Sequence, residues 1–279
     1  MFIELDRVEK PLRELRKLLK SMPDDPQPEE VHRLRTRTRR IESIAAALDP
    51  SGEKRTRRLL KVLKPVRKAA GNVRDVDVLT GDLLRLRQKS NSASIDRLME
   101  YLNELRRESA SDLADAVNEQ RKPARRNLQK YARMLESAAV GKKPVRSEGV
   151  DENGSVADRL IEELASWPRL NAGNLHPFRL KVKKLRYVLE MFPGTDAGLM
   201  NALADVKERV GEWHDWQQLM AMASEVLDPG RDRALLDEIE AMGGKKLAEA
   251  LGTANALRRR YLTAVAQVDD SSVARKAAS

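Results

Sequence analysis

The chain has 279 residues and a net charge of +10, and 34% of its residues are charged. It contains no cysteine, which excludes disulfides and thiolate metal sites. No segment approaches the roughly 20 consecutive apolar residues that a membrane-spanning helix needs, so we expect no membrane association. The N-terminal residues carry charge throughout and lack an apolar signal region, so we expect a cytoplasmic protein.

Apolar residues recur at three- and four-residue spacing along the whole chain, and no strand pattern is present, which predicts an all-α fold. Gly71 is expected to end one helix in a left-handed conformation, and Asn72 to cap the next. The predicted helices cover residues 4–22, 28–48, 53–70, 72–87, 95–117 and 122–140, and then 158–167, 176–192, 202–210, 213–227, 231–242 and 246–268.

Two segments read as connections rather than helices. Residues 141–155 are rich in glycine, proline and polar residues, which is typical of a linker. We expect this linker to join two halves, residues 1–140 and 156–268, within a single domain. Residues 269–279 are expected to form a frayed tail.

The positive charge is concentrated in one segment. Residues 31–70 hold 13 lysine and arginine residues against 3 acidic ones, an excess of 10 that equals the net charge of the whole chain. An ordinary solvated helix surface would carry carboxylates among its basic residues. We therefore interpret this segment as a surface whose field attracts an anionic partner.

The sequence VHRLRTRTRR places these charges on one helix face. Five arginines fall within eight residues, and no carboxylate lies among them. His32, Arg35 and Arg39 lie on the side opposite Leu34 and Ile41. Like charges one turn apart destabilise a helix, so a polyanion that neutralises them is expected to stabilise this one.

The next predicted helix carries a second basic stripe. Arg57, Lys61, Lys64 and Lys68 follow one another at spacings of four, three and four residues. On a helix, these positions share a narrow side. The two basic stripes are expected to face each other across a cleft that repulsion keeps open until an anion enters.

Both basic elements have a second copy in the chain. His32, Arg35, Arg39, Arg40 and Ile41 recur 144 residues later as His176, Arg179, Lys183, Lys184 and Leu185. Gly71, Asp75 and Leu79 of GNVRDVDVL recur 140 residues later as Gly211, Asp215 and Leu219 of GEWHDWQQL. Two matches at nearly one offset indicate two similar helical halves. We expect the paired aspartates to orient neighbouring basic side chains by hydrogen bonding.

The VHRLRTRTRR and GNVRDVD elements and their second copies resemble the CHAD domain, the conserved-histidine α-helical domain, over about residues 1–268. The resemblance implies two four-helix-bundle-like halves about a pseudo-two-fold axis. It also implies a basic central cleft that binds inorganic polyphosphate, and an association with polyphosphate granules. Some members carry a triphosphate-processing CYTH domain, which we do not expect here.

The expected ligand is polyphosphate, with phosphate or sulfate able to occupy the same site. Arginine offers planar bidentate donors to phosphate oxygens, and lysine offers a point charge. The expected binding residues are His32, Arg35, Arg39, Arg40, Arg57, Lys61, Lys64, Lys68, Arg74 and Arg126, followed by His176, Arg179, Lys183, Lys184, Arg186, Lys207 and His214.

Two other functions compete with polyphosphate binding. A nucleic-acid ligand is compatible with the charge, but few aromatic side chains are available for stacking on bases. A metal-assisted phosphohydrolase would need carboxylates beside the basic face, where the arginine-rich helix offers Glu42 alone. His214-Asp215 superficially resembles a metal-binding pair, but Arg74 takes the place of the histidine in the first copy. We expect no metal, no cofactor and no catalytic residue, and hence a non-enzymatic binding protein.

Overall fold

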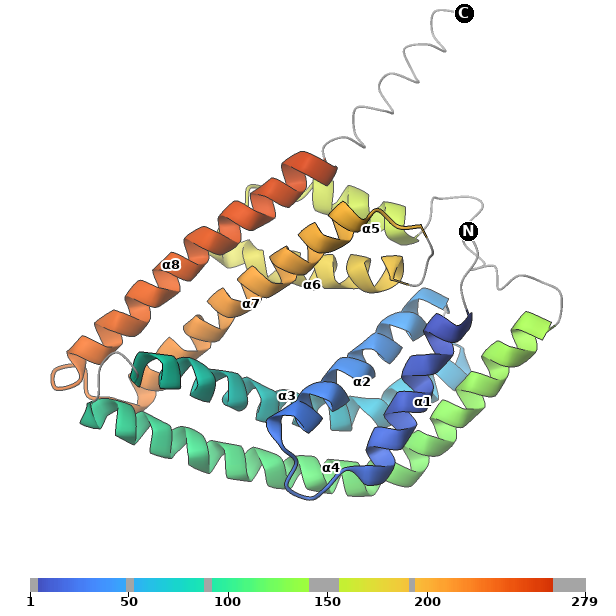
Figure 1. Cartoon of the computed structure of the whole chain (residues 1–279), viewed down its shortest axis with the longest axis horizontal. Coiled ribbons are helices and arrows are strands. Elements are labelled where there is room, and N and C mark those ends of the chain that lie inside the picture. Colours follow the sequence, from blue (N-terminus) through green and yellow to red (C-terminus); the bar gives the residue numbers. More distant parts are fainter. Residues whose placement is uncertain (1–4, 49–52, 88–91, 141–155, 191–193, 263–279) are drawn as a thin grey trace, which may run out of the picture. The chain divides into compact units, whose positions relative to one another are not determined.

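The structure is a computed structural model that describes residues 5–48, 53–87, 92–140, 156–190 and 194–262. These ranges contain α-helices and no strand, which confirms the all-α prediction. The predicted linker at 141–155 and the predicted tail at 269–279 lie outside the described residues. The helices are α1 (Leu5–Ser21), α2 (Pro28–Leu48), α3 (Lys54–Arg87), α4 (Ala93–Val140), α5 (Val156–Ala165), α6 (Ala172–Leu189), α7 (Ala197–Val226) and α8 (Arg233–Leu257), and α8 is followed by a π-helical turn, η1 (Arg258–Leu262) (Figure 1).

Four predicted helix breaks are wrong. Gly71 lies inside α3, residues 117–122 lie inside α4, residues 210–213 lie inside α7, and the Gly243-Gly244 pair lies inside α8. In α3 the buried side chains continue at helical spacing on both sides of the glycine, with Ala70 and Val73 fully buried. A glycine costs about 1 kcal/mol inside a helix, and burial of such a continuous apolar side outweighs that penalty.

The second basic helix begins earlier than the sequence suggested. Asn171 is the N-cap of α6, and its side chain accepts hydrogen bonds from the backbone of Gly173 at 2.8 Å and of Asn174 at 3.2 Å. The side chain of Asn174 accepts in turn from the backbone N–H of Asn171 at 2.9 Å. This reciprocal capping satisfies the first free N–H groups of the helix, so α6 starts at Ala172 rather than at residue 176.

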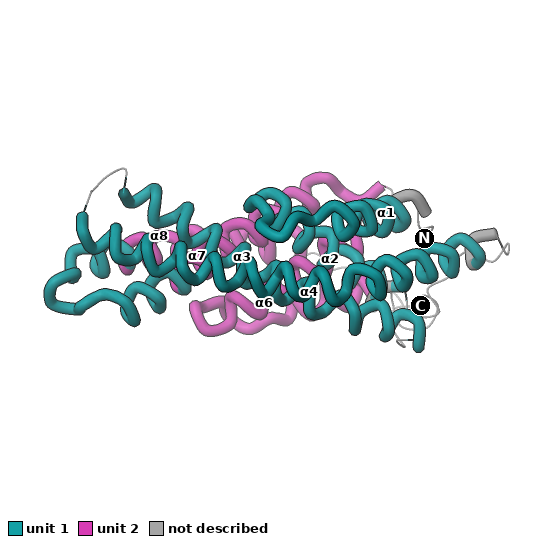
Figure 2. Tube along the Cα trace, turned by 90° about the horizontal axis from the view of Figure 1, so that it is seen from below, with its two compact units in different colours: residues 1–147, 218–239 teal, residues 148–217, 240–279 magenta. Residues whose placement is uncertain are grey.

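The chain divides into two compact units, shown in teal and magenta in Figure 2. Unit 1 comprises residues 1–147 and 218–239, and unit 2 comprises residues 148–217 and 240–279. The division therefore differs from the two halves expected from the repeat, because residues 218–239 belong to unit 1.

In unit 1, α3 packs against α2 and α4, and α1 packs against the same two helices. Two arginines of α4 hold the connection between α1 and α2. Arg106 donates to the carboxylate of Asp77 at 2.9 Å and to the carbonyl of Pro26 at 2.9 Å. Arg121 donates to the carbonyl of Met22 at 3.2 Å. These contacts fix the start of α2, the helix that carries the arginine-rich face.

In unit 2, α5 packs against α6 and against η1. Arg258 donates to the carbonyls of Ala165 and Pro168, both at 3.2 Å, and so satisfies free acceptors at the end of α5. Trp167 meets the fully buried Phe178 edge-on, with the ring centroids 5.7 Å apart. This contact helps to fix the buried side of α6.

A buried carboxylate ties the α7–α8 connection to α4 within unit 1. Asp232 is 2% exposed and accepts hydrogen bonds from the Ser94 hydroxyl at 2.7 Å, from Arg97, and from the backbone of Asp228 at 3.0 Å. The Ser94 hydrogen bond, which outweighs the effect of burial, and the contribution of Arg97 lower the pKa of Asp232 to about 2.

This lowered pKa predicts an acid-sensitive contribution to stability. Because the carboxyl titrates at about 2 in the folded state and near 3.8 otherwise, its contribution is complete above pH 3.8 and is lost as the pH falls towards 2. D232N should lower the urea midpoint of unfolding at pH 7, and the difference from the unsubstituted chain should narrow between pH 4 and pH 2. D237N is the matched control. Asp237 and its partner Arg233 are both exposed and lie 3.6 Å apart, and an exposed ion pair of this kind contributes little to stability. Equal midpoints for D232N and the unsubstituted chain at pH 7 would contradict this account.

Candidate anion-binding sites

The arginine-rich face of α2 is held outward by an apolar side that is completely buried. Val31, Leu34 and Ile41 are each 0% exposed. Thr38 is also 0% exposed, and its hydroxyl donates to the carbonyl of Leu34 at 2.7 Å, so this polar group is satisfied inside the helix. His32 is exposed on the other side of the helix.

Arg35 joins the two sequence elements of unit 1. Its Nη1 donates to the carbonyl of Gly71 at 3.2 Å and to the carboxylate of Asp75 at 2.5 Å. A β-carbon at Gly71 would lie 4.0 Å from the guanidinium, which is ordinary contact distance. The glycine and the aspartate of the second element therefore seat and orient the arginine of the first.

Other arginines of this region meet carboxylates that the local sequence does not reveal. Arg37 pairs with Glu14 of α1 at 2.7 Å, and Arg67 of α3 pairs with Glu42 of α2 at 2.6 Å. Burial raises the pKa of Glu42, and the opposing effect of Arg67 is smaller. The expectation of a face free of carboxylates therefore needs correction, since neighbouring helices supply acidic partners.

The basic stripe of α3 differs from the α2 face in its exposure. Arg57, Lys61, Lys64 and Lys68 are all exposed to solvent. Arg74 of the same helix is half-buried, and Arg126 of α4 is exposed. The stripe is thus an accessible row of cations within unit 1.

In unit 2, Arg179 lies against α7 as Arg35 lies against α3, and it comes closer to the paired glycine than Arg35 does. Its Nε donates to the carbonyl of Lys207 at 2.9 Å. A β-carbon built on the buried Gly211 would lie only 2.7 Å from Nη2 of the arginine. Gly211 therefore permits the close approach of Arg179, and it does not end a helix.

Histidines of the two elements also meet in unit 2. The rings of His176 and His214 lie 4.3 Å apart between centroids and are tilted by 58°. Both side chains are half-buried. The repeat places Arg74 of unit 1 at the position of His214.

Lys207 of α7 lies near two arginines of α6, Arg179 and Arg186. Arg186 bonds Glu190 at 2.9 Å, an i,i+4 pair that the sequence spacing indicates. Burial lowers the pKa of Lys207, and the nearby charges of Arg186 and Arg179 lower it further, against smaller contributions from Glu208 and Glu190. The structure thus brings three predicted residues together.

The remaining predicted residues lie on α2 and α6. Arg39, Arg40 and Lys183 are half-buried, and Lys184 is exposed. The assignment of the complete set stays a prediction, as does the cleft shared by the two halves.

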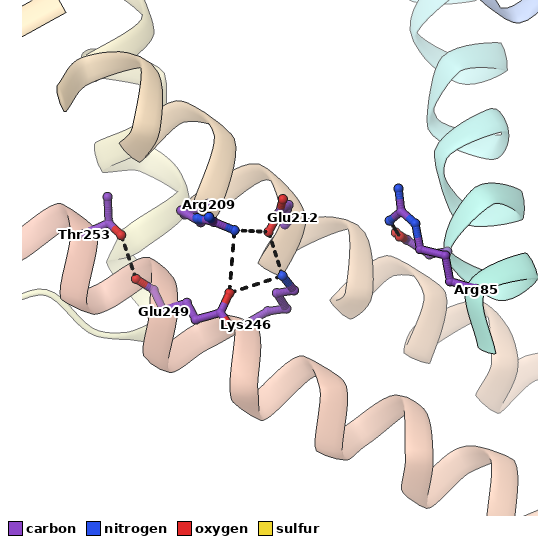
Figure 3. Close-up of polar contacts among 7 residues, drawn as sticks. Arg85, Arg209, Glu212, Lys246, Glu249 and Thr253 are labelled. Carbon is purple, nitrogen blue, oxygen red and sulfur yellow. Dashed lines mark hydrogen bonds and ion pairs between the residues drawn. The ribbon is translucent and has the colours of Figure 1, made fainter. Parts of the chain in front are cut away.

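A further ion network in unit 2 has balanced charge and therefore offers no net attraction to an anion (Figure 3). Lys246 contacts the carboxylates of Glu212 at 2.8 Å and Glu249 at 3.2 Å, and Arg209 contacts Glu212 at 3.2 Å. Burial would raise the pKa of Glu212, but the hydrogen bond and charge of Lys246 leave it lowered. The network ties α7 to α8, and Glu212 takes this role where the first copy has Asn72.

The described residues bear on two other kinds of site, metal centres and membrane spans. Within the described ranges, no three histidine, aspartate or glutamate side chains gather closely enough to hold a metal ion. No described helix combines the length and the apolar character needed to cross a membrane.

The sequence matches the CHAD domain family over residues 7–224, and the chain belongs to this family. Among solved structures, it resembles the crystal structure of the CHAD domain from the plant Ricinus communis, with a TM-score of 0.60 and 18% identity over 92% of this chain and 88% of that one. It also resembles PptA from Streptomyces chartreusis, with a TM-score of 0.60 and 16% identity over 92% of this chain and 98% of that one. These likenesses establish a shared fold. A comparison with curated proteins finds no match.

The two paired glycines give a test of the arginine seats. G71A should raise the free energy of unfolding by about 0.5–1 kcal/mol, because the helix gains an alanine and the new methyl group meets Arg35 at an ordinary distance. G211A should raise the free energy of unfolding less than G71A does, or lower it, because Arg179 must move away from the new methyl group. Urea unfolding of both variants measures the difference, and an equal gain for the two substitutions would contradict the close seat in unit 2.

Proposed function

We propose that this chain binds inorganic polyphosphate without hydrolysing it. The observation that carries the proposal is the accessible row Arg57, Lys61, Lys64 and Lys68, which stands in the same unit as the arginine-rich face of α2. Membership of the CHAD domain family supports the same ligand, because the sequence resemblance implies a polyphosphate-binding surface.

The chemistry of the ligand suits such a surface. Linear polyphosphate carries about one negative charge per phosphate and has no bases to read, so binding needs many cations along a track. Four exposed cations over three helical turns of α3 provide part of that track. Arg35 and Arg179, whose orientations are fixed by Gly71 and by the Lys207 carbonyl, add donors with a defined direction.

The proposed site of action is the cytoplasm, on polyphosphate granules. A fluorescent fusion of the chain should concentrate on granules in cells that accumulate polyphosphate, and should be diffuse in cells that lack it.

Charge reversal on the exposed stripe tests the surface directly. K61E/K64E should weaken binding of long-chain polyphosphate by roughly tenfold or more at low salt, because two attractive contacts become repulsive. Both side chains are exposed, so the helical circular dichroism should not change. K130E/K245E reverses two exposed lysines elsewhere and is the matched control. Equal binding by K61E/K64E and this control would reject the stripe as part of the site.

Competition and product analysis separate the rival functions. Long-chain polyphosphate should displace single- or double-stranded nucleic acid at equal phosphate concentration, and displacement in the opposite direction would favour a nucleic-acid ligand. Incubation with polyphosphate should release no orthophosphate, with or without Mg²⁺ or Mn²⁺. Steady release that scales with protein concentration would establish a hydrolase instead.

A further inference from the structure

The two aspartates of the GNVRDVD element hold different helices. They are two positions apart on α3, so their side chains leave this helix in nearly opposite directions. Asp75 contacts Arg35 of α2 at 2.5 Å. Asp77 instead accepts a hydrogen bond from Nε of Arg106 of α4 at 2.9 Å, and its side chain is only 4% exposed. Asp75 therefore meets the arginine-rich helix directly, whereas Asp77 contacts α4.

Arg106 connects the buried Asp77 to the start of α2. Its Nη2 donates to the carbonyl of Pro26 at 2.9 Å, and α2 begins at Pro28. Its Nη1 lies 3.4 Å from the carboxylate of Asp25 in the same connection. The donors of a guanidinium lie in one rigid plane, so the carboxylate of Asp77 orients the fork that holds Pro26.

These contacts attach α2 to its neighbours at two polar points. The first is the Pro26 carbonyl, which Arg106 holds. The second is Arg35, which Asp75 holds. Hydrophobic packing has no direction of its own, whereas hydrogen bonds at two points along a helix restrict both its rotation and its sliding. The exposed His32 lies between the two points, so the first turns of the arginine-rich face are oriented by them.

Unit 2 also holds the connection before its basic helix through an arginine. Arg258, the first residue of η1, donates to the carbonyl of Pro168 at 3.2 Å, and α6 follows from Ala172. The offset of 140 places Gln217 opposite Asp77, and Gln217 is exposed. The two units therefore share an arginine that holds a proline carbonyl, but the aspartate at this position belongs to unit 1.

We propose that Asp77 and Arg106 are positioning residues for polyphosphate binding, which align the arginine-rich face of α2 without touching the ligand. This inference rests on the proposed function and gives a negatively charged side chain a role in binding an anion. Replacing a buried ion pair by apolar side chains is often neutral for stability, so orientation accounts for this pair better than stability does. Removing the carboxylate makes the chain more positive, so attraction alone would make D77N bind a polyanion more tightly. Alignment predicts weaker binding instead.

Calorimetric titration of the full chain with long-chain polyphosphate tests this difference in sign. D77N should weaken binding by about tenfold, the equivalent of one charge-assisted hydrogen bond, because the arginines of α2 no longer meet the phosphates in alignment. D112N is the matched control, since it removes the charge of an exposed aspartate of α4 and should bind at least as tightly as the unsubstituted chain. Circular dichroism and urea unfolding establish that each variant is folded at the temperature of the titration.

R106K separates geometry from charge and is the milder change for folding. Lysine keeps the charge but cannot present a planar fork to Asp77 and Pro26 together, so R106K should also weaken binding. R121K is the matched control, because Arg121 holds the Met22 carbonyl at the α1 end of the same connection. The logarithm of the affinity should fall less steeply with the logarithm of the salt concentration for D77N and R106K, because fewer cations contact phosphates. A purely structural role would lower the urea midpoint and leave this slope unchanged.

The outcomes distinguish this inference from the proposed function. Failure of the unsubstituted chain to bind polyphosphate would overturn both. If the unsubstituted chain binds, an affinity of D77N equal to or higher than that of D112N would overturn the positioning role and leave polyphosphate binding intact. Equal affinities and equal salt slopes for R106K and R121K would also overturn it.

Discussion

In each unit, an arginine of the basic helix contacts the backbone near a glycine of the next helix. This contact fixes the position of the basic helix against its neighbour. Arg35 reaches the carbonyl of Gly71, and Arg179 lies against Gly211 while donating to the carbonyl of Lys207. Because Gly211 carries no side chain, the guanidinium of Arg179 can lie close to the backbone of α7, whereas a β-carbon at Gly71 would meet Arg35 at an ordinary contact distance. Burial of the opposite, apolar sides of α2 and α6 offsets the repulsion among the cations that these helices bring together.

The cations lie in three environments, and they contribute to stability and to anion attraction differently in each. Some are neutralised by acids from neighbouring helices, as Arg67 is by Glu42, and these bonds strengthen helix packing. Others stand exposed on α3, where salt screens them but an approaching polyanion feels their combined field. Lys207 is partly buried, and burial together with the charges of Arg186 and Arg179 lowers its pKa. A repeating polyanion is suited to a surface that attracts it along a row of cations.

The sequence predicted those features of the structure that local residue patterns determine. Helical periodicity indicated the all-α fold, and the run of arginines between residues 33 and 40 indicated a basic face on α2. Local turn signals failed at Gly71 and at the Gly243-Gly244 pair, which both lie inside helices. At Gly71, burial of the apolar side of α3 outweighs the preference of glycine for turns. Ion pairs such as Arg37–Glu14 joined separate helices and had no local signal.

The central claim is that cations fixed on helix faces bind polyphosphate by electrostatic attraction. Calorimetric titration of the full chain with polyphosphates of several defined lengths, each at a series of salt concentrations, tests it most directly. We predict an affinity that rises with chain length and whose logarithm falls linearly with the logarithm of the salt concentration, because binding releases counterions. An affinity that is independent of salt and of chain length, or no binding at any length, would contradict it.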